Sequence, residues 1–470
     1  MEHPGPQRVL MIGGGLNGSI MEALKHPTVQ RIDYVELDPA LIAIAERTGI
    51  RLSGPRIQVH LLDGRRYLNS TNELFDVILV STPDPDNAQL NRFYTAEFFR
   101  LARNHLASGG IVAIQLRSSE EAISPDMAEF QRCIYATLRE QLLYTAMIPG
   151  ETLYLFAARD AGVLTEEPKV LLTRLRSRHL ESTYVREYFL PFRMAPDRMA
   201  QMKETLRLRP DTPRNHDMHP VAYYFATILW TAQVDSAYVH WLKLGSRLRM
   251  PALISGLAFL SLVFAVGATR VRGTWRVVTG WSIIATGYTL MALEILLLLS
   301  FQSVFGYVYQ GLAMLVGAMM AGIGLGSWSG IRTVRSKNRT MLMNAIAANQ
   351  LALTAAAPVV LMIAGFFSQN LHGTSSNLIV LIVFPALAFL AGIPGGFQFP
   401  VASAIYHCNP AQQSGTGTVY ALDLIGGCCG AAVLSAFLIP LFGFWSTAWL
   451  TSMIAAGPAL TFLACLRLRS

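Results

Sequence analysis

Apolar and polar positions follow different patterns in the two parts of the chain. Between residues 8 and 159, short apolar runs alternate with stretches of helical periodicity, and after residue 250 long apolar stretches recur. Short, nearly continuous apolar strands joined by helices are typical of a doubly wound parallel sheet that is covered on both faces. We therefore expect an α/β Rossmann-like domain in residues 1–160, a helical connecting region in 161–250 and an all-α membrane domain in 251–470.

The same pattern places the individual elements of the first domain. Helices are expected after Gly18, after Pro39, at 94–105 and at 126–142. The run Ser108-Gly109-Gly110 is expected to form the turn that ends one of these helices. Strands are expected at residues 9–12, 32–36, 57–61, 77–80, 111–116 and 152–157.

Seven apolar stretches after residue 250 are long enough to cross a bilayer, for which about 20 residues are needed. The third contains Gly322, Gly326 and Gly330, and the sixth contains the run 426–430; small residues at such spacings let helix backbones approach closely. The number of crossings falls from seven to six if the first stretch does not cross fully or if one long segment is broken. The seven stretches are residues 251–269, 278–300, 309–330, 342–367, 377–402, 417–443 and 445–466.

Composition supports a membrane protein and argues against a nucleic-acid partner. The chain is 52% hydrophobic and only 14% charged, and its net charge is +8. Residues 251–470 hold nine Lys/Arg and two acids, so the apolar half carries +7 of this charge. These basic residues lie in short clusters between apolar stretches, which is typical of cytoplasmic loops of membrane proteins. The expected macromolecular surface is therefore the lipid bilayer, and no nucleic acid is expected.

A glycine-rich turn and two acids mark the expected nucleoside site. Gly13, Gly14 and Gly15 follow the first strand, where glycines allow positive φ and bring backbone N–H groups close to a ligand. Glu36 ends the second strand, the place of a carboxylate that accepts hydrogen bonds from both ribose hydroxyls. Asp63 and Gly64 end the third strand, where an acid can accept from an adenine amino group. The alternative is that both acids only cap loops.

The loop after the fourth strand is the expected place of reaction. Ser81 follows the apolar run 77–80, and Asp84 and Asp86 follow closely, at the edge where open α/β sheets bind ligands. Tyr94 is either a core residue or part of the pocket wall. The loop therefore predicts Asp84 as the catalytic group and Ser81, Asp86 and Tyr94 as substrate-binding residues.

Several motifs resemble the spermidine synthase (polyamine aminopropyltransferase) family. Over residues 5–160 the resemblance is carried by "VLMIGGGLNGSIMEALKHPTVQRIDYVELDPALI", "LLDGRRYL", "FDVILVSTPDP" and "FYTAEFFRLARNHLASGG". A narrower bacterial subgroup, in which this domain is fused to transporter-like membrane helices, is similar in "AQLNRFYTAEFF", "RNHDMHPVAYYF" and "ALEILLLLSFQSVFGYVYQ". The resemblance implies a domain of the S-adenosylmethionine-dependent methyltransferase type that binds decarboxylated S-adenosylmethionine at the glycine turn, Glu36 and Asp63. A polyamine acceptor would then receive the aminopropyl group, and methylthioadenosine would leave.

Three departures from the family pattern weaken the expected amine site. The family places an aspartate where this chain has Ser81, and a hydroxyl cannot take a proton from an ammonium group at neutral pH. The family's aspartate after the three glycines is Leu16 here, so intact S-adenosylmethionine is less firmly excluded. We also expect the small β domain that precedes the glycine turn in the family to be missing. Asp84, aligned with the family's second loop aspartate, remains the best-placed carboxylate.

Two other functions therefore remain open beside aminopropyl transfer. One is methyl transfer from intact S-adenosylmethionine. The other is a sensor or transporter that binds a polyamine or nucleoside without turnover. A homo-oligomer is compatible with each of them.

The side of the membrane is not decided by the charges. The basic clusters at 270–276, 332–339 and 467–469 favour the cytoplasm, and an odd number of crossings would then place the first domain outside. Lys243, Arg247 and Arg249 favour the inside. We expect a bacterial inner (cell) membrane protein with a cytoplasmic first domain, because the adenosyl donor is made in the cytoplasm.

Glu294 and Asp423 are the only acids of the apolar half. A charged group in lipid is costly, so both should face the interior of the helices. They predict either a cation or polyamine site or a structural hydrogen bond, which Gln302 and Tyr307 could complete for Glu294. His216 and His219 lack a third ligand of clear position, and no metal is expected.

Overall fold

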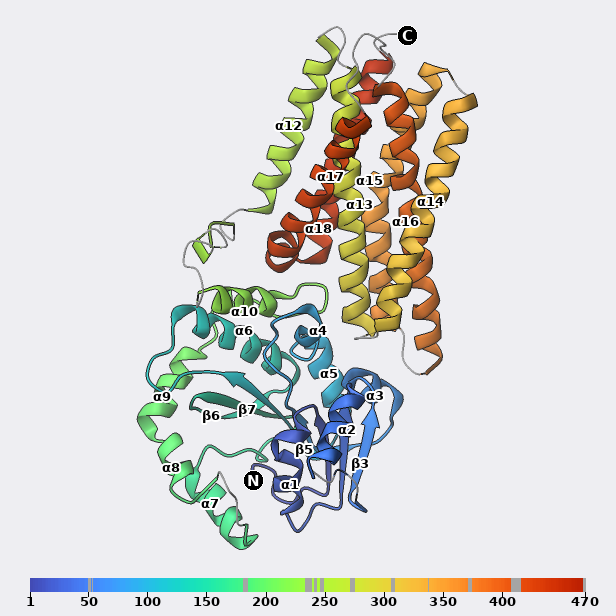
Figure 1. Ribbon diagram of the computed structural model, residues 1–470. Coiled ribbons are helices and arrows are strands. Elements are labelled where there is room, and N and C mark those ends of the chain that lie inside the picture. Colours follow the sequence, from blue (N-terminus) through green and yellow to red (C-terminus); the bar gives the residue numbers. More distant parts are fainter. Residues whose placement is uncertain are drawn as a thin grey trace. The chain divides into compact units, whose positions relative to one another are not determined.

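The computed structural model describes residues 1–49, 52, 54–180, 185–232, 239–240, 243–245, 249–270, 275–305, 309–336, 338–370, 374–406 and 416–467. The chain forms two compact units, Met1–Ser236 and Ala237–Ser470. The first unit contains a sheet with helices around it, and the second consists of helices (Figure 1).

The first unit alternates strands and helices along most of its length. Its strands are β1 (Arg8–Ile12), β2 (Arg31–Glu36), β3 (Ile57–Leu61), β4 (Phe75–Val80), β5 (Leu106–Arg117), β6 (Tyr144–Ile148) and β7 (Thr152–Ala158). Its helices are η1 (Gly15–Asn17), α1 (Ser19–Leu24), α2 (Pro39–Arg47), α3 (Gly64–Ser70), α4 (Ala88–Asn91), α5 (Ala96–Asn104), α6 (Pro125–Gln141), α7 (Pro168–Ser177), α8 (Phe189–Arg193), α9 (Pro196–Thr205) and α10 (Val221–Thr231).

The strands form one seven-stranded mixed sheet in the order β3-β2-β1-β4-β5-β7-β6. β1 to β5 are parallel, as expected, but β7 runs antiparallel to both β5 and β6. The expectation of a wholly parallel sheet is therefore wrong at this edge, because a short turn instead of a crossover helix joins β6 to β7. The fold is a Rossmann-like domain of the methyltransferase type.

The expected turn at residues 108–110 lies inside β5. Leu106 pairs with Phe75, the next paired residues are Ile111 and Val77, and the register shifts between them. Gly109, with φ 73°, belongs to this irregular stretch. The glycines thus form a bulge within the strand instead of a turn before it.

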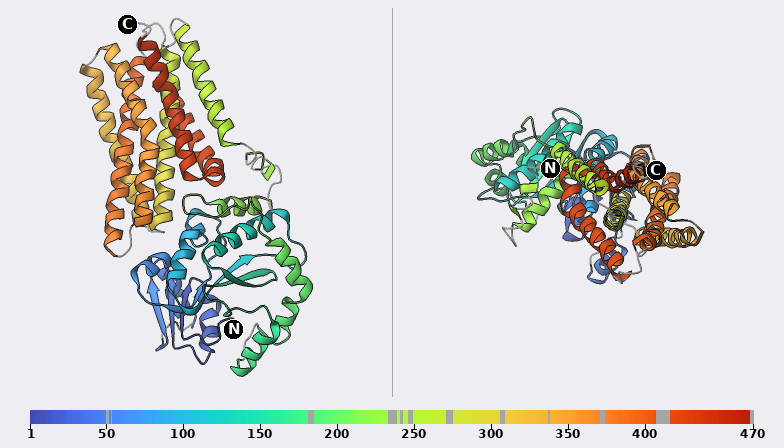
Figure 2. Two further views of the ribbon diagram at one scale, coloured as in Figure 1. Left: turned by 180° about the vertical axis from the view of Figure 1, so that it is seen from behind. Right: turned by 90° about the horizontal axis from the view of Figure 1, so that it is seen from above.

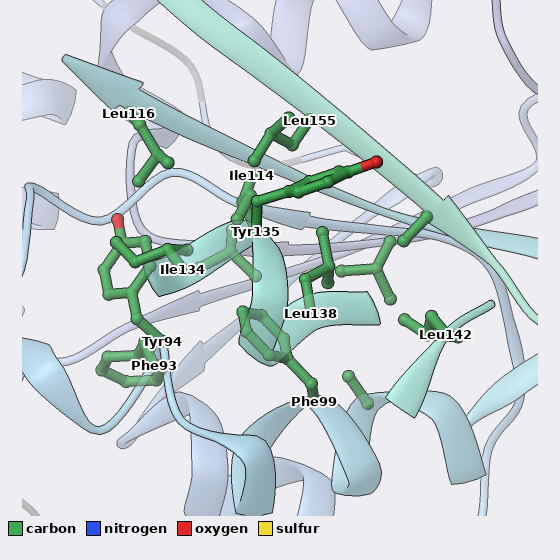
Figure 3. Close-up of a cluster of buried hydrophobic side chains, with 14 of the residues drawn as sticks. Phe93, Tyr94, Phe99, Ile114, Leu116, Ile134, Tyr135, Leu138, Leu142 and Leu155 are labelled. Carbon is green, nitrogen blue, oxygen red and sulfur yellow. The ribbon is translucent and has the colours of Figure 1, made fainter. Parts of the chain in front are cut away.

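Helices cover both faces of the sheet, which explains why its central strands β1 and β4 are apolar at nearly every position. Leu10 and Ile12 belong to the core on the side of α5 and α6, whereas Val9 and Met11 belong to a second core that includes residues of α1 and α2. The larger core is drawn in Figure 3, where aromatic and aliphatic side chains of strands and helices meet. The carboxyl ends of the parallel strands lie at one edge of the sheet, and the helices on both faces hold these ends in place.

Much of the expected connecting region belongs to the first unit. Leu171 of α7, Met202 of α9 and Ala222 of α10 are buried in the same core as the sheet. Helix α10 also packs against α6. The helices between residues 168 and 231 thus form an outer layer of this unit.

The second unit contains long apolar helices, seen from two further sides in Figure 2. They are α12 (Met250–Arg270), α13 (Trp275–Phe305), α14 (Tyr309–Ser336), α15 (Arg339–Asn370), α16 (Thr374–Tyr406), α17 (Thr416–Val433), the π-helical turn η2 (Leu434–Leu438) and α18 (Ile439–Arg467).

Six stretches of the described helices are long and apolar enough to cross a membrane. The last of them, Gly417–Cys465, has 49 residues, which is about twice the length that one crossing needs. The backbone leaves the helical conformation at Gly443, with φ 74° and ψ 178°. The two final stretches expected from the sequence are therefore joined in one helical run that is broken at this glycine.

Glycines bring the backbones of two helix pairs into contact. A Cβ added to Gly322 or Gly326 of α14 would lie 2.1 Å from a carbonyl oxygen of α16. Similarly, a Cβ on Gly426 of α17 would lie 2.1 Å from the carbonyl oxygen of Ile284 in α13. The small-residue spacing read from the sequence thus marks places where helix backbones of this unit are in contact.

Candidate functional site

The glycine turn after β1 is closely packed on two sides. Gly13 and Gly14 have φ values of 68° and 67°, and the Gly13 N–H donates to the carbonyl oxygen of Val35 at 3.0 Å. A Cβ on Gly14 would lie 2.4 Å from the Cβ of Ser81, and one on Gly15 would lie 2.5 Å from the Tyr34 ring. Any larger residue would therefore push apart β1, β2 and β4 at the edge of the sheet.

Glu36 is held in a fixed orientation at the tip of β2. Its Oε2 accepts from the Tyr34 hydroxyl at 2.8 Å, and its Oε1 accepts from the backbone N–H groups of Leu37 at 2.8 Å and Asp38 at 3.2 Å. Burial, together with the neighbouring Glu36 carboxylate, raises the pKa of Tyr34, so the hydroxyl remains a donor. A carboxylate has about four acceptor positions, two on each oxygen, so Oε2 can still accept one ribose hydroxyl, whereas Oε1 already accepts two backbone N–H groups.

Asp63 has structural partners on both carboxylate oxygens. Its Oδ1 caps α3 by accepting from the N–H groups of Arg65 at 3.0 Å and Arg66 at 3.1 Å. Its Oδ2 accepts from the Arg92 guanidinium at 2.8 Å, and both side chains of this ion pair are almost fully buried. Beside it, a Cβ on Gly64 would lie 2.5 Å from Ile12. The capping alternative therefore describes much of what Asp63 does, and its contact with an adenine stays a prediction.

A second ion pair ties the segment around Asp217 to this corner. Arg65 donates two hydrogen bonds of 2.8 Å to the Asp217 carboxylate, and the Thr95 hydroxyl donates a third of 2.8 Å. His216 and His219 pair through their backbones, and His216 contacts Glu97. Within the described residues, no group of three His, Cys, Asp or Glu side chains could hold a metal ion. Residues 214–220 thus connect α3 to the start of α5 through these hydrogen bonds.

The hydroxyl of the buried Tyr94 holds the loop after β4. This hydroxyl contacts the carbonyl oxygens of Thr82 and Pro83, each at 3.0 Å, and burial raises its pKa. The ring is fully buried within the core cluster (Figure 3). In this conformation Tyr94 is a core residue that holds the loop after β4 through its hydroxyl. Its predicted contact with substrate stays a prediction.

Ser81 and Asp84 occupy the expected edge of the sheet. The Ser81 N–H donates to the Ile12 carbonyl oxygen at 3.0 Å, and its side chain lies over Gly14. Asp84 is 11% exposed, and its carboxylate contacts Arg117 through the backbone N–H at 3.3 Å and through Nε at 2.5 Å. Asp86 lies further out, 3.9 Å from the same guanidinium. Arg117 ends β5 and was not among the expected site residues.

Burial raises the pKa of Asp84, although Arg117 acts in the opposite direction. The net direction means that the carboxyl accepts a proton more readily than an exposed aspartate does. This is a useful property for a group that should take a proton from an amine, provided that Arg117 leaves room for the amine.

Glu294 and Asp423 belong to the second unit. Both are partly buried, and Asp423 lies beside α13, where a Cβ on Gly287 would be 2.9 Å from its Oδ1. Of the groups proposed to satisfy Glu294, Gln302 is partly buried and Tyr307 lies outside the described residues. Their predicted role as a cation or polyamine site stays a prediction.

Comparison with known proteins places the first third of the chain in a family. Residues 1–156 match the model of the spermine/spermidine synthase domain. The chain is 37% identical over 147 residues to a polyamine aminopropyltransferase of Oceanobacillus iheyensis, covering 30% of this chain and 27% of that protein. It is 36% identical over 140 residues to one of Korarchaeum cryptofilum, covering 29% of this chain and 41% of that protein.

These matches span about a quarter to two fifths of the relatives' lengths. A solved spermidine synthase in complex with the transition state analogue AdoDATO is similar at 23% identity, with 44% of this chain and 70% of that chain covered and a TM-score of 0.35. The family match and the relatives show that residues 1–156 are a spermine/spermidine synthase domain with polyamine aminopropyltransferase homologues, and an all-helical region with apolar helices forms the C-terminal part of the described chain.

Proposed function

We propose that this protein is a membrane-bound aminopropyltransferase. Its first unit would bind decarboxylated S-adenosylmethionine, with the ribose on Glu36 and the adenine near Asp63 and Gly64. The acceptor would be a polyamine or another small amine held near Asp84. The orientation of Glu36 supports this proposal most strongly, because two sets of donors fix a carboxylate at the strand tip that a ribose diol requires.

The reaction is a direct displacement. The lone pair of a neutral amine attacks the aminopropyl carbon next to the sulfonium, the carbon–sulfur bond breaks, and methylthioadenosine leaves without charge. The new secondary ammonium, or the amine before attack, gives its proton to Asp84 or to water. A primary amine has a pKa of about 10, so this proton acceptor is needed at neutral pH.

The six long apolar stretches support attachment to a bilayer. We propose the inner membrane of a bacterium, with the first unit in the cytoplasm, where the donor is made. Treating intact cells and inside-out vesicles with a protease tests this orientation. Cleavage within residues 1–236 should occur only in the inside-out vesicles, and cleavage in intact cells would contradict it.

Methyl transfer is the second candidate, and Leu16 favours it. This residue is apolar and packs against the core on the side of α1 and α2, so it supplies no carboxylate that would repel the carboxylate of intact S-adenosylmethionine. One assay separates the candidates: the detergent-purified full chain is incubated with each donor and with small amines, and the nucleoside product is identified by mass. Methylthioadenosine supports aminopropyl transfer, S-adenosylhomocysteine supports methyl transfer, and binding without either product supports a sensor or transporter.

Replacing Ser81 by aspartate should raise aminopropyl turnover by at least about tenfold, because a general base typically contributes more than that. The Ser81 side chain lies over Gly14, so a carboxylate there would stand between the donor turn and the loop of Asp84. Ser81→Asn, which has the same shape without the charge, is the matched control. Equal turnover of the two variants would contradict a role for a base at this position.

The rate of aminopropyl transfer should fall as the pH falls through the pKa of Asp84. Only the carboxylate form can take a proton, and because burial raises this pKa, the loss should begin at a higher pH than for an exposed aspartate. The measurement is kcat/KM between pH 5 and 9. In Asp84→Asn the residual activity should no longer fall at low pH. If the fall at low pH is unchanged in this variant, another group causes it.

A further inference from the structure

The guanidinium of Arg117 already occupies the place at Asp84 where the amine acceptor is proposed to bind. Asp84 accepts hydrogen bonds from the Arg117 backbone N–H at 3.3 Å and from its Nε at 2.5 Å. The guanidinium therefore lies where the proposed function needs an ammonium group. Charge-assisted hydrogen bonds of this kind are among the stronger ones in proteins.

The charges around Arg117 do not cancel. Asp84 and Asp86 face the guanidinium, with Asp86 Oδ1 at 3.9 Å from Nη2. Asp86 Oδ1 is buried and has no hydrogen-bond partner in the part of the chain that the structure describes. Two carboxylates and one guanidinium leave a net charge of about −1 if all three are ionised. The cluster can therefore still attract a cation, but much less strongly than two free carboxylates would.

Two contacts hold Arg117 in this position. The Trp230 ring of α10 lies against the guanidinium, with its centroid 5.6 Å from Cζ. The Gln131 side chain of α6 donates to the Arg117 carbonyl oxygen at 2.9 Å. A guanidinium over the face of a tryptophan ring is attracted electrostatically by the ring. The guanidinium is thus held by Trp230 of α10 as well as by the carboxylate, and Gln131 of α6 fixes the backbone of the same residue.

We propose that Arg117 is a specificity-determining residue whose guanidinium occupies the acceptor-ammonium position at Asp84, so that an amine acceptor binds by exchanging with it. This inference rests on the proposed function for the identity of the acceptor. Trp230 holds the guanidinium on Asp84, and Asp86 offers a second carboxylate beside Asp84 to the ammonium group that takes the place of the guanidinium. Such an exchange favours a compact primary ammonium, which can form its hydrogen bonds to one carboxylate oxygen beside a displaced arginine.

The inference is tested by binding and not by turnover. The dissociation constant of 1,4-diaminobutane is measured by calorimetry on the detergent-purified full chain, for wild type and Arg117→Gln. Removing the internal cation should lower this constant by about tenfold, a conservative value for the loss of one like charge within a few ångström. In Arg117→Gln, added methylguanidinium should compete with the diamine at Asp84 and restore weaker binding.

Two further variants keep the test independent of the folding of Arg117→Gln. Trp230→Phe weakens the hold on the guanidinium and should tighten diamine binding by about threefold. Arg176→Gln is the matched control, because it removes an exposed arginine paired with Glu187 elsewhere in the same unit, and it should leave binding unchanged.

Tighter diamine binding in Arg117→Gln or Trp230→Phe, with an unchanged Arg176→Gln, supports the inference. Equal or weaker binding in both variants overturns it, as does the absence of diamine binding in every variant. A failure of the proposed function is seen separately: the diamine then binds as described here, while the product assay yields no methylthioadenosine.

Discussion

Glu36→Gln should weaken the binding of methylthioadenosine by about a hundredfold. The hydrogen bond from a ribose hydroxyl to a charged acceptor is lost or weakened, and such a bond contributes about 1.5–3 kcal/mol. A hundredfold change corresponds to about 2.7 kcal/mol and therefore lies in the upper part of this range. The amide keeps one acceptor oxygen, so the backbone donor of Leu37 or the Tyr34 hydroxyl can still be satisfied. Calorimetry with the full chain measures the dissociation constant directly.

Glu46→Gln is the matched control for this experiment. Glu46 lies in α2, the helix that follows Glu36, and its side chain is exposed. The change removes the same charge from the same part of the unit, so it should leave nucleoside binding unaltered. An equal and small effect of both variants would mean that the nucleoside does not lie across the tip of β2, and the proposed function would lose its main support.

Much of the fold could be predicted because its strands are short apolar runs with helices on both faces. β1 to β4 lie within a few residues of the expected positions, and they are parallel, as the helices between them predicted. The sequence did not reveal β6, because Tyr144 and Thr145 continue directly from the end of the long helix α6. Without β6 there was no hairpin, and so the antiparallel direction of β7 was missed as well.

The sequence predicted the acidic residues of the candidate site, but it did not predict the arginines that pair with them. Glu36, Asp63 and Asp84 follow strands, and a position at the end of a strand is visible in the local pattern. Their partners come from distant positions: Arg92 is 29 residues from Asp63, and Arg117 is 33 residues from Asp84. No local periodicity reports such pairs. The only signal was the place of Arg117 at the end of a predicted strand, on the same edge as the acids.

In the second unit, hydropathy located the helices, and glycine spacing located their contacts. The two final crossings expected from the sequence lie in one apolar stretch of 49 residues, and the helical backbone of this stretch is broken at Gly443. A glycine with positive φ ends the helical backbone there without a change in hydropathy. The number of crossings therefore could not be read from apolar length alone.

Arg92→Ala should lower the stability of the first unit by about 3–5 kcal/mol, the usual cost of leaving one partner of a buried ion pair behind. The Arg92 and Asp63 side chains are 2% and 7% exposed, so water cannot easily replace the guanidinium. Asp63 would keep the backbone donors at the start of α3 and lose its charged partner. The apparent melting temperature of this unit should fall by roughly 10 °C, given a shift of about 2–4 °C per kcal/mol for a unit of this size.

Heating the detergent-solubilised full chain with a brief protease pulse, and following peptides from residues 1–236, measures this melting separately from the helical unit. Arg176→Ala removes an exposed arginine that is paired with Glu187, and it should leave the melting temperature unchanged because solvent screens that pair. A similar small shift in both variants would mean that Arg92 contributes no more than a surface arginine. Asp63 would then be held only by the hydrogen bonds of its Oδ1 at the start of α3, and its Oδ2 would be free to accept a hydrogen bond from the adenine of the donor.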